Sequence, residues 1–390
     1  MKANVRLNFG LASRFANAVA DQVLIFAVPM FVYSVSKSVS YAAFVFCLEW
    51  IPRLISIPLG GSLVDLYGTS KVFKVADISR FLISLLMFFY VFYNPIPNFV
   101  VLGLMSGAIG FFHEQAYIAL ESSVPHLAGE AGIVKLQSKL QFIDIVGQIL
   151  GPAAAAFALN FFDIKYLFIV VSFVYLFSFF SVSLLPNSVV AEFKNTILKS
   201  VAEGFSVLFK SRQLVSISIV TFFANIIYGA LLAIAPGYSQ HNLKWSAQVF
   251  GTFMSLSAMF SALVFMIIPF IEKRLNFDAV GKMSFFLVAL GGIIFSLGES
   301  NYIFAMSFYI ILLGDSVWGI FMRSRRVQFI PKDKLGSVLS ASILLNLTAM
   351  PIGSAIAAQL ESVGLLKYYF PVAGILAIAI YLKEKKHIFG

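Results

Sequence analysis

The chain has 390 residues, of which 60% are hydrophobic and only 12% are charged, and its mean hydropathy is +0.91. Because a soluble domain carries about 25% charged residues, this composition excludes a water-soluble protein and predicts a membrane protein surrounded by lipid. The net charge of +10 does not indicate nucleic-acid binding, since basic residues of membrane proteins gather in cytoplasmic loops.

Apolar stretches long enough to cross a bilayer recur along the whole chain. A spanning helix needs about 20 apolar residues, and the first stretch is too long for the apolar region of a secretory signal. We therefore expect a retained first helix and twelve spans in all. They lie at about residues 7–35, 40–63, 76–94, 97–120, 136–160, 165–185, 213–235, 247–271, 280–298, 301–322, 336–360 and 364–382.

Basic residues alternate with these spans. If both termini and the even-numbered connections share one side, that side receives most of the 28 Lys and Arg residues. The positive-inside rule then predicts that both termini lie in the cytoplasm of a multi-pass inner-membrane protein. In this count Arg53 lies inside a helix, and the residues left on the opposite side are Lys37, Lys165, Lys244 and Lys367.

The longest connection divides the chain into two sets of six spans. It predicts a six-helix bundle at 1–185, a cytoplasmic linker at 186–212 and a second bundle at 213–390. Apolar residues recur at helical spacing in the linker, which indicates an amphipathic helix on the membrane surface. Weak matches at a constant offset relate the two halves, as in the internal repeats of many secondary transporters.

The connection after the second span carries a patterned set of residues, Gly61, Asp65, Gly68 and Lys71. Gly61 lets another helix approach closely, while Asp65 at the helix end can cap or pair with the end of a facing helix. Gly68 permits a tight turn. We expect this short charged segment to act as a latch on the cytoplasmic face, although an ordinary loop with a helix-capping Asp would give the same pattern.

This segment resembles the loop signature of the major facilitator superfamily, G-x-x-x-D-R-x-G-R-K/R. The two central basic positions are Leu66 and Thr69 here. Asp65 and Lys71 match the charge relay of that family, and this departure puts the rest of the relay in doubt. The resemblance implies an all-α membrane protein with twelve transmembrane helices in two pseudo-symmetric six-helix bundles, and it implies transport.

A second motif lies in the fifth span, where GQILGPAAAA provides Gly147, Gly151 and Pro152. The two glycines favour close helix packing, and the proline bends the helix. The motif is similar to G-x-x-x-G-P-x-x-G of exporting branches of the superfamily, with Ala155 in place of the last Gly. Simple helix packing is the alternative.

More widely, the sequence resembles the branch of enterobactin-type siderophore exporters and macrolide efflux proteins, which implies efflux by an antiporter.

Polar residues inside the apolar spans are costly and therefore mark function. Four acids are candidates for proton coupling: Asp21, Asp144, Asp315 and Glu114. Burial disfavours the ionised form of such a group, which lets it load and release a proton. Candidates for lining the substrate cavity are Arg14, Asn17, Glu49, Arg53, Gln141, Gln148, Asn225, Tyr228, Trp318 and Asn346. A structural ion pair is an equal alternative for Glu49 and Arg53, which are four residues apart.

The sequence has no phosphate-binding loop and no zinc-binding HExxH motif. We therefore expect no enzyme, no cofactor and no metal, and an ion gradient as the source of energy. The leading hypothesis is a monomeric transporter that exports an amphiphilic small molecule, a siderophore or a drug, by proton antiport. Uptake or facilitated diffusion of a small solute, and a non-transporting receptor or assembly protein, are the alternatives.

Overall fold

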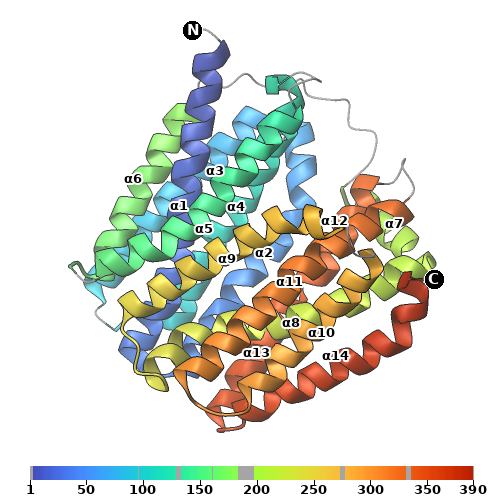
Figure 1. Cartoon of the computed structure of the whole chain (residues 1–390). Helices are drawn as coiled ribbons and strands as arrows, with labels where there is room; N and C mark the ends of the chain where they lie inside the picture. The colour runs from blue at the N-terminus through green and yellow to red at the C-terminus, as the bar shows by residue number, and fades with distance from the viewer. Residues whose placement is uncertain are drawn as a thin grey trace. The chain divides into compact units, whose positions relative to one another are not determined.

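The computed structural model describes residues 3–94, 96–128, 133–159, 161–182, 197–272, 277–330 and 335–389, and these residues are almost entirely helical (Figure 1). Twelve helical segments within them are long and apolar enough to cross a membrane. The all-α fold with twelve membrane helices expected from the sequence is therefore confirmed.

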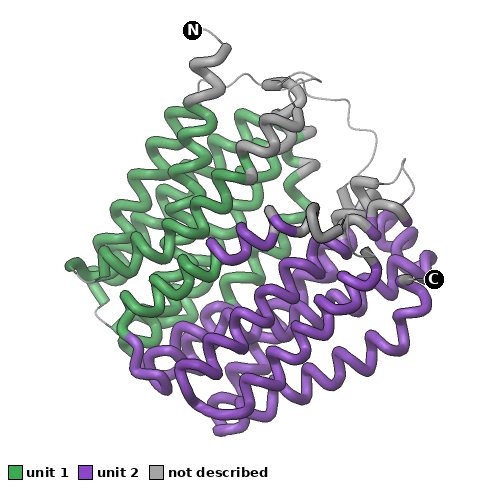
Figure 2. The backbone as a smooth tube through the Cα atoms, viewed as in Figure 1, with its two compact units in different colours: residues 1–35, 48–197, 246–258 green, residues 36–47, 198–245, 259–390 purple. Residues whose placement is uncertain are grey.

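The chain forms two compact units, shown in different colours in Figure 2. The first comprises residues 1–35, 48–197 and 246–258, and the second comprises residues 36–47, 198–245 and 259–390. These units follow packing, and each takes a short segment from the other half of the sequence. The domain boundaries at 185 and 213 stay a prediction.

The first unit is built mainly from six helices. They are α1 (Ala3–Ser36), α2 (Val39–Tyr67), α3 (Thr69–Tyr93), α4 (Phe99–Ala128), α5 (Ile133–Leu159) and α6 (Ile164–Val182). Most of the second unit comes from the other eight. They are α7 (Ile197–Lys210), α8 (Arg212–His241), α9 (Ala247–Glu272), α10 (Phe277–Phe295), α11 (Asn301–Phe329), α12 (Leu335–Leu347), α13 (Ala349–Ser362) and α14 (Leu366–Phe389).

Gly68 makes the turn between α2 and α3 by itself. Its φ of 81° lies in the left-handed region that favours glycine, and its amide donates to the carbonyl of Val64 at 2.8 Å. The exposed Lys71 lies over the ring of Tyr67 at 5.1 Å. Gly61 and Asp65 belong to the loop motif as well, but their side chains lie outside the described residues, so the latch stays a prediction.

The glycines of the fifth span allow α5 to approach α1 closely. A methyl group on Gly147 would lie 2.8 Å from Cβ of Ala18, and one on Gly151 would meet Cβ of Gln22. The two contacts lie four residues apart on both helices, so one face of α5 packs along one face of α1. Pro152 lies inside α5, and the helix continues beyond it.

The amphipathic helix expected in the linker corresponds to α7. Leu208 of this helix is fully buried in a cluster with Leu214 and Ile330, whereas the next residue, Phe209, is 61% exposed. The helix therefore packs through Leu208 and leaves the neighbouring Phe209 exposed, and its place on the membrane surface stays a prediction.

One span of the second unit is perturbed locally. Residues 341–362 are long and apolar enough to cross the membrane, but α12 ends at Leu347 and α13 begins at Ala349. The hydroxyl of Thr348 donates to the carbonyl of Leu345 at 2.6 Å, and Pro351 has no amide to donate to the carbonyl of Leu347. The backbone of Thr348 nevertheless stays in the right-handed helical region, and its amide donates to the carbonyl of Leu344 at 3.1 Å, so the span is perturbed locally and continues through this residue.

Candidate functional site

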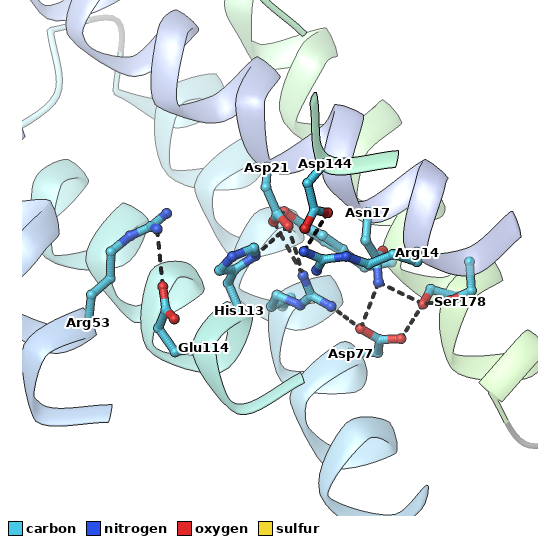
Figure 3. A network of polar contacts seen from close by, with 12 residues as sticks. Arg14, Asn17, Asp21, Arg53, Asp77, His113, Glu114, Asp144 and Ser178 are labelled. Carbon is cyan, nitrogen blue, oxygen red and sulfur yellow. Dashed lines mark hydrogen bonds and ion pairs between the residues drawn. The ribbon is translucent and has the colours of Figure 1, made fainter. Parts of the chain in front are cut away.

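A buried polar network joins four helices of the first unit (Figure 3). Its central acid is Asp21 of α1, which is 3% exposed. Nδ1 of His113 on α4 lies 2.6 Å from Oδ2 of this carboxylate, and the Tyr175 hydroxyl on α6 donates to Oδ1 at 2.7 Å. A guanidinium nitrogen of Arg80 on α3 lies 3.3 Å from both carboxylate oxygens. Every oxygen of Asp21 therefore has a partner from another helix.

A second carboxylate, Asp77 of α3, belongs to the same network. It is completely buried, pairs with Arg80 one turn further along the helix, and accepts a hydrogen bond from Ser178. Asn17 of α1 donates to Asp77 at 3.4 Å and to Ser178 at 2.9 Å. We call Asn17, Asp21, Asp77, Arg80, His113, Tyr175 and Ser178 the Asp21–Arg80 network.

Helical spacing explains how so many polar groups converge. Asn17 and Asp21 are four residues apart on α1, while Asp77 and Arg80 on α3, like Tyr175 and Ser178 on α6, are three residues apart. Residues at these separations share one helix face, so each helix presents two polar groups inward. The ring of Tyr175 also lies 4.5 Å from the Arg80 guanidinium, in a cation–π contact.

The charges of this network do not balance without a proton. Asp21 and Asp77 together carry two negative charges when ionised, and Arg80 supplies one positive charge. Buried charges must be paired, so the network gains from a further positive charge or from protonation of a carboxyl. The ring nitrogen of His113 faces Asp21, and the His113 side chain is 18% exposed.

Two further ion pairs lie in the same unit. Arg14 of α1 contacts Asp144 of α5 at 2.6 Å and lies 4.9 Å from the ring of Tyr117. Arg14 therefore pairs with Asp144, whereas Asp21 on the same helix pairs with Arg80.

The pair that the spacing of Glu49 and Arg53 suggests is replaced by a pair between helices. Arg53 of α2 contacts Glu114 of α4 at 3.5 Å and lies near the ring of Trp50. Glu49 is 4% exposed and is hydrogen-bonded to Ser106 of α4. Its Oε1 atom has no hydrogen-bond partner.

The polar candidates of the second unit form a separate group. Trp318 of α11 donates to the Thr221 hydroxyl of α8 at 3.1 Å, and the Asn225 side chain of α8 donates to the backbone carbonyl of Asn346 at 2.9 Å. Asn346 is buried next to the local perturbation between α12 and α13, and its own carboxamide has no partner. Tyr228 of α8 and Asp315 of α11, both partly buried, interact electrostatically.

The glutamines of α5 do not join either group in the described part of the chain. Gln148 is exposed, and the side chain of Gln141 lies outside the described residues. Their role in a cavity stays a prediction.

Sequence reasoning missed four members of the Asp21–Arg80 network, namely Asp77, Arg80, Tyr175 and Ser178. Arg80 was counted with the cytoplasmic basic residues, which was wrong: it is 1% exposed and lies inside the span Thr69–Tyr93. Arg14 was counted in the same way and is also buried inside a span. The available signal was the spacing of Asp77 and Arg80, which puts an acid and a base on one face of an apolar helix.

No three His, Cys, Asp or Glu side chains within the described ranges gather closely enough to hold a metal ion. In the Asp21–Arg80 network, Asp21 contacts the histidine and the tyrosine, whereas Asp77 contacts Arg80, Ser178 and Asn17.

Comparisons with known proteins agree with this fold. The structure is similar to a bacterial homologue of the iron transporter ferroportin in an inward-facing state, with 16% identity, a TM-score of 0.70 and coverage of 98% of this chain and 99% of that one. It is similar to the nucleoside transporter NupG at 11% identity and a TM-score of 0.78, with both chains fully covered. A D-xylose–proton symporter matches at 16% identity and a TM-score of 0.74, over 97% of this chain and 98% of that one.

At these identities the structural likeness shows the fold, and no curated protein matches the sequence. The profile of the Major Facilitator Superfamily matches residues 10–380, which is nearly the whole chain. The chain therefore belongs to the major facilitator superfamily and is a membrane transporter rather than an enzyme.

Proposed function

We propose that this transporter exports an amphiphilic small molecule across the inner membrane in exchange for protons. The observation that carries the proposal is the Asp21–Arg80 network, in which two buried carboxylates share one guanidinium and one of them, Asp21, also contacts a histidine. Burying several ionisable groups in a membrane costs free energy. A transporter benefits from such groups if a proton must bind to them and leave them during each transport cycle.

Proton transfer can be followed through the geometry. When His113 is protonated, its ring and Arg80 together balance Asp21 and Asp77. When the proton leaves, the network carries one uncompensated negative charge, which favours a conformation that brings water or substrate to it. A change of conformation driven by this charge would switch the side to which the substrate cavity opens, as alternating access requires.

The direction of transport rests on the motif of Gly147, Gly151 and Pro152 and on the resemblance to siderophore and macrolide exporters. Siderophores carry anionic groups and would suit Arg14 and Arg53, whereas macrolides are cationic and would suit Asp21 and the aromatic residues. The other reading is uptake, since the structural neighbours include a D-xylose–proton symporter. We place both termini in the cytoplasm and treat the monomer as the working unit.

Liposomes with an imposed pH difference test this function. Purified protein should move a labelled macrolide or a labelled catechol siderophore against its gradient only when protons run the opposite way. If protons moving in the same direction as the substrate drive its accumulation, the protein is a symporter and the proposal is wrong. If the pH difference has no effect on transport, the protein is a facilitator and the proposal is also wrong.

Asp21→Asn provides the residue-level test of coupling. The change keeps the size of the side chain and removes its charge, so the network balances without an exchangeable proton. We expect the variant to exchange labelled substrate across the membrane but to lose concentration against a gradient. Concentrative transport equal to that of the wild type would show that coupling lies elsewhere.

The matched control for this test is Asp163→Asn. Asp163 is 73% exposed and pairs with Lys165 between α5 and α6, so the same chemical change there should leave both exchange and driven transport intact.

A further inference from the structure

A second buried acid of the first unit stands apart from the Asp21–Arg80 network. Glu49 lies on α2, is 4% exposed, and has one carboxyl oxygen without any hydrogen-bond partner. The Glu49 carboxyl group forms a hydrogen bond with the Ser106 side chain on α4. An ionised carboxylate in this setting would be left largely unsolvated and unpaired.

The other acids inside the spans of α1 to α5 have a cation in direct contact. Among the described residues, Asp144 contacts Arg14 and Glu114 contacts Arg53, while Asp21 and Asp77 share Arg80 and the ring of His113. Among the acids whose side chains the structure describes in these spans, Glu49 is the one that forms no ion pair. The charge that acts on it is that of Arg53 on its own helix, and the Arg53 guanidinium already contacts Glu114.

We propose that Glu49 is a proton-binding site, protonated and neutral in this conformation, and separate from the proton shared by His113 and Asp21. A neutral carboxylic acid keeps the hydrogen bond with Ser106 and avoids burying an uncompensated charge. Glu49 loses its proton when the ion pair between Arg53 and Glu114 opens. The freed Arg53 guanidinium lies one helical turn from Glu49 and then stabilises the ionised form of Glu49. This inference rests on the proposed proton-driven transport and adds a second proton to it.

Infrared difference spectroscopy of the whole protein in liposomes tests the site without any substrate. A protonated carboxylic acid absorbs separately from a carboxylate, so raising the pH should remove an acid band from the wild-type spectrum. Glu49→Gln should lack this band, whereas Asp21→Asn should keep it. The matched control is Glu299→Gln, which makes the same change at an exposed position and should keep the band as well.

Two further variants keep the test decisive if Glu49→Gln fails to fold. Ser106→Ala retains Glu49 but removes its hydrogen bond, so the acid band should shift in frequency. Glu114→Gln frees Arg53 to pair with Glu49, so the band should weaken at neutral pH. A band that survives in folded Glu49→Gln, or that neither Ser106→Ala nor Glu114→Gln changes, would overturn the assignment.

The spectra also separate this inference from the proposed function. If the band belongs to Glu49 but the pH difference does not drive transport, the proton site stands and the antiport is wrong. If transport is proton-driven but the band does not belong to Glu49, the second site alone is wrong.

Discussion

Arg80 holds the buried centre of the first unit together. Its guanidinium contacts two carboxylates and a tyrosine ring, and the residue is 1% exposed. Replacing a buried ion pair by apolar groups can be neutral, but removing one partner leaves the other charge buried and uncompensated. The stability of the unit should therefore depend far more on Arg80 than on either acid alone.

Arg80→Gln should lower the free energy of unfolding by about 3–5 kcal/mol, because it strands Asp21 and Asp77 in an apolar environment. Thermal unfolding of the purified protein in detergent measures the effect. The double variant Arg80→Gln with Asp77→Asn should recover part of the loss, since one carboxylate then remains to face His113.

Lys165→Gln is the comparison for Arg80→Gln. Lys165 pairs with the exposed Asp163 at 3.1 Å, and pairs of this kind contribute at most about 1 kcal/mol. If both single variants unfold alike, the Asp21–Arg80 network does not carry the stability assigned to it.

Only some features of the buried polar sites could be predicted from the sequence. The cost of a charge in an apolar span correctly singled out Asp21, Arg14 and Glu49 as buried groups. Partner choice could not be predicted, because Arg53 is one turn from Glu49 in sequence yet contacts Glu114 on another helix. Which helices face each other decides such pairs, and hydropathy carries no information about that.

At the scale of whole helices, glycine decides how closely α1 and α5 approach. Gly147 and Gly151 leave no room for a side chain against Ala18 and Gln22. The sequence predicted this packing face, since two glycines four residues apart form a smooth strip on a helix. The single span predicted at residues 336–360 corresponds to the span Ala341–Ser362, and the local perturbation at Thr348 was not predicted from hydropathy.

Gly151→Ala should destabilise the protein by about 1–3 kcal/mol, the usual cost of overpacking a filled interior. The added methyl group meets Gln22, so α5 must move away from α1. Thermal unfolding in detergent measures the loss.

Gly319→Ala is the matched control for Gly151→Ala. Gly319 lies in α11, and a methyl group there would have no atom within 4 Å. Stability should stay the same or rise, because alanine favours a helix over glycine by about 1 kcal/mol. Equal destabilisation by both variants would mean that the α1–α5 contact is not the cause.

For the whole molecule, the number of spans and their orientation follow from different properties. Twelve apolar stretches in the sequence correspond to twelve helical segments able to span, since hydropathy and length alone define a span. Orientation depends on the loop charges, and the structure removes Arg14 and Arg80 from that count because both are buried within spans. The remaining basic residues still favour cytoplasmic termini.

A reporter that fluoresces only in the cytoplasm, fused after Gly390, should therefore be bright in cells. Truncation and fusion after Lys244, in the connection between α8 and α9, should give a stable but dark protein. Fluorescence and immunoblotting of both fusions measure the result. A dark, stably expressed fusion at Gly390 would reverse the topology.

The first three helices share a feature that bears on how the chain is made. Each carries one acid and one base within its apolar stretch: Arg14 with Asp21, Glu49 with Arg53, and Asp77 with Arg80. During synthesis each helix enters the bilayer before the later helices exist, when every unpaired charge at its centre costs about 2.5–3.5 kcal/mol. An acid and a base on the same segment let it insert with no net charge. In the structure Arg53 contacts Glu114 of α4 instead, so on this account the proposed neutral state of Glu49 arises only after α4 has joined the first three helices.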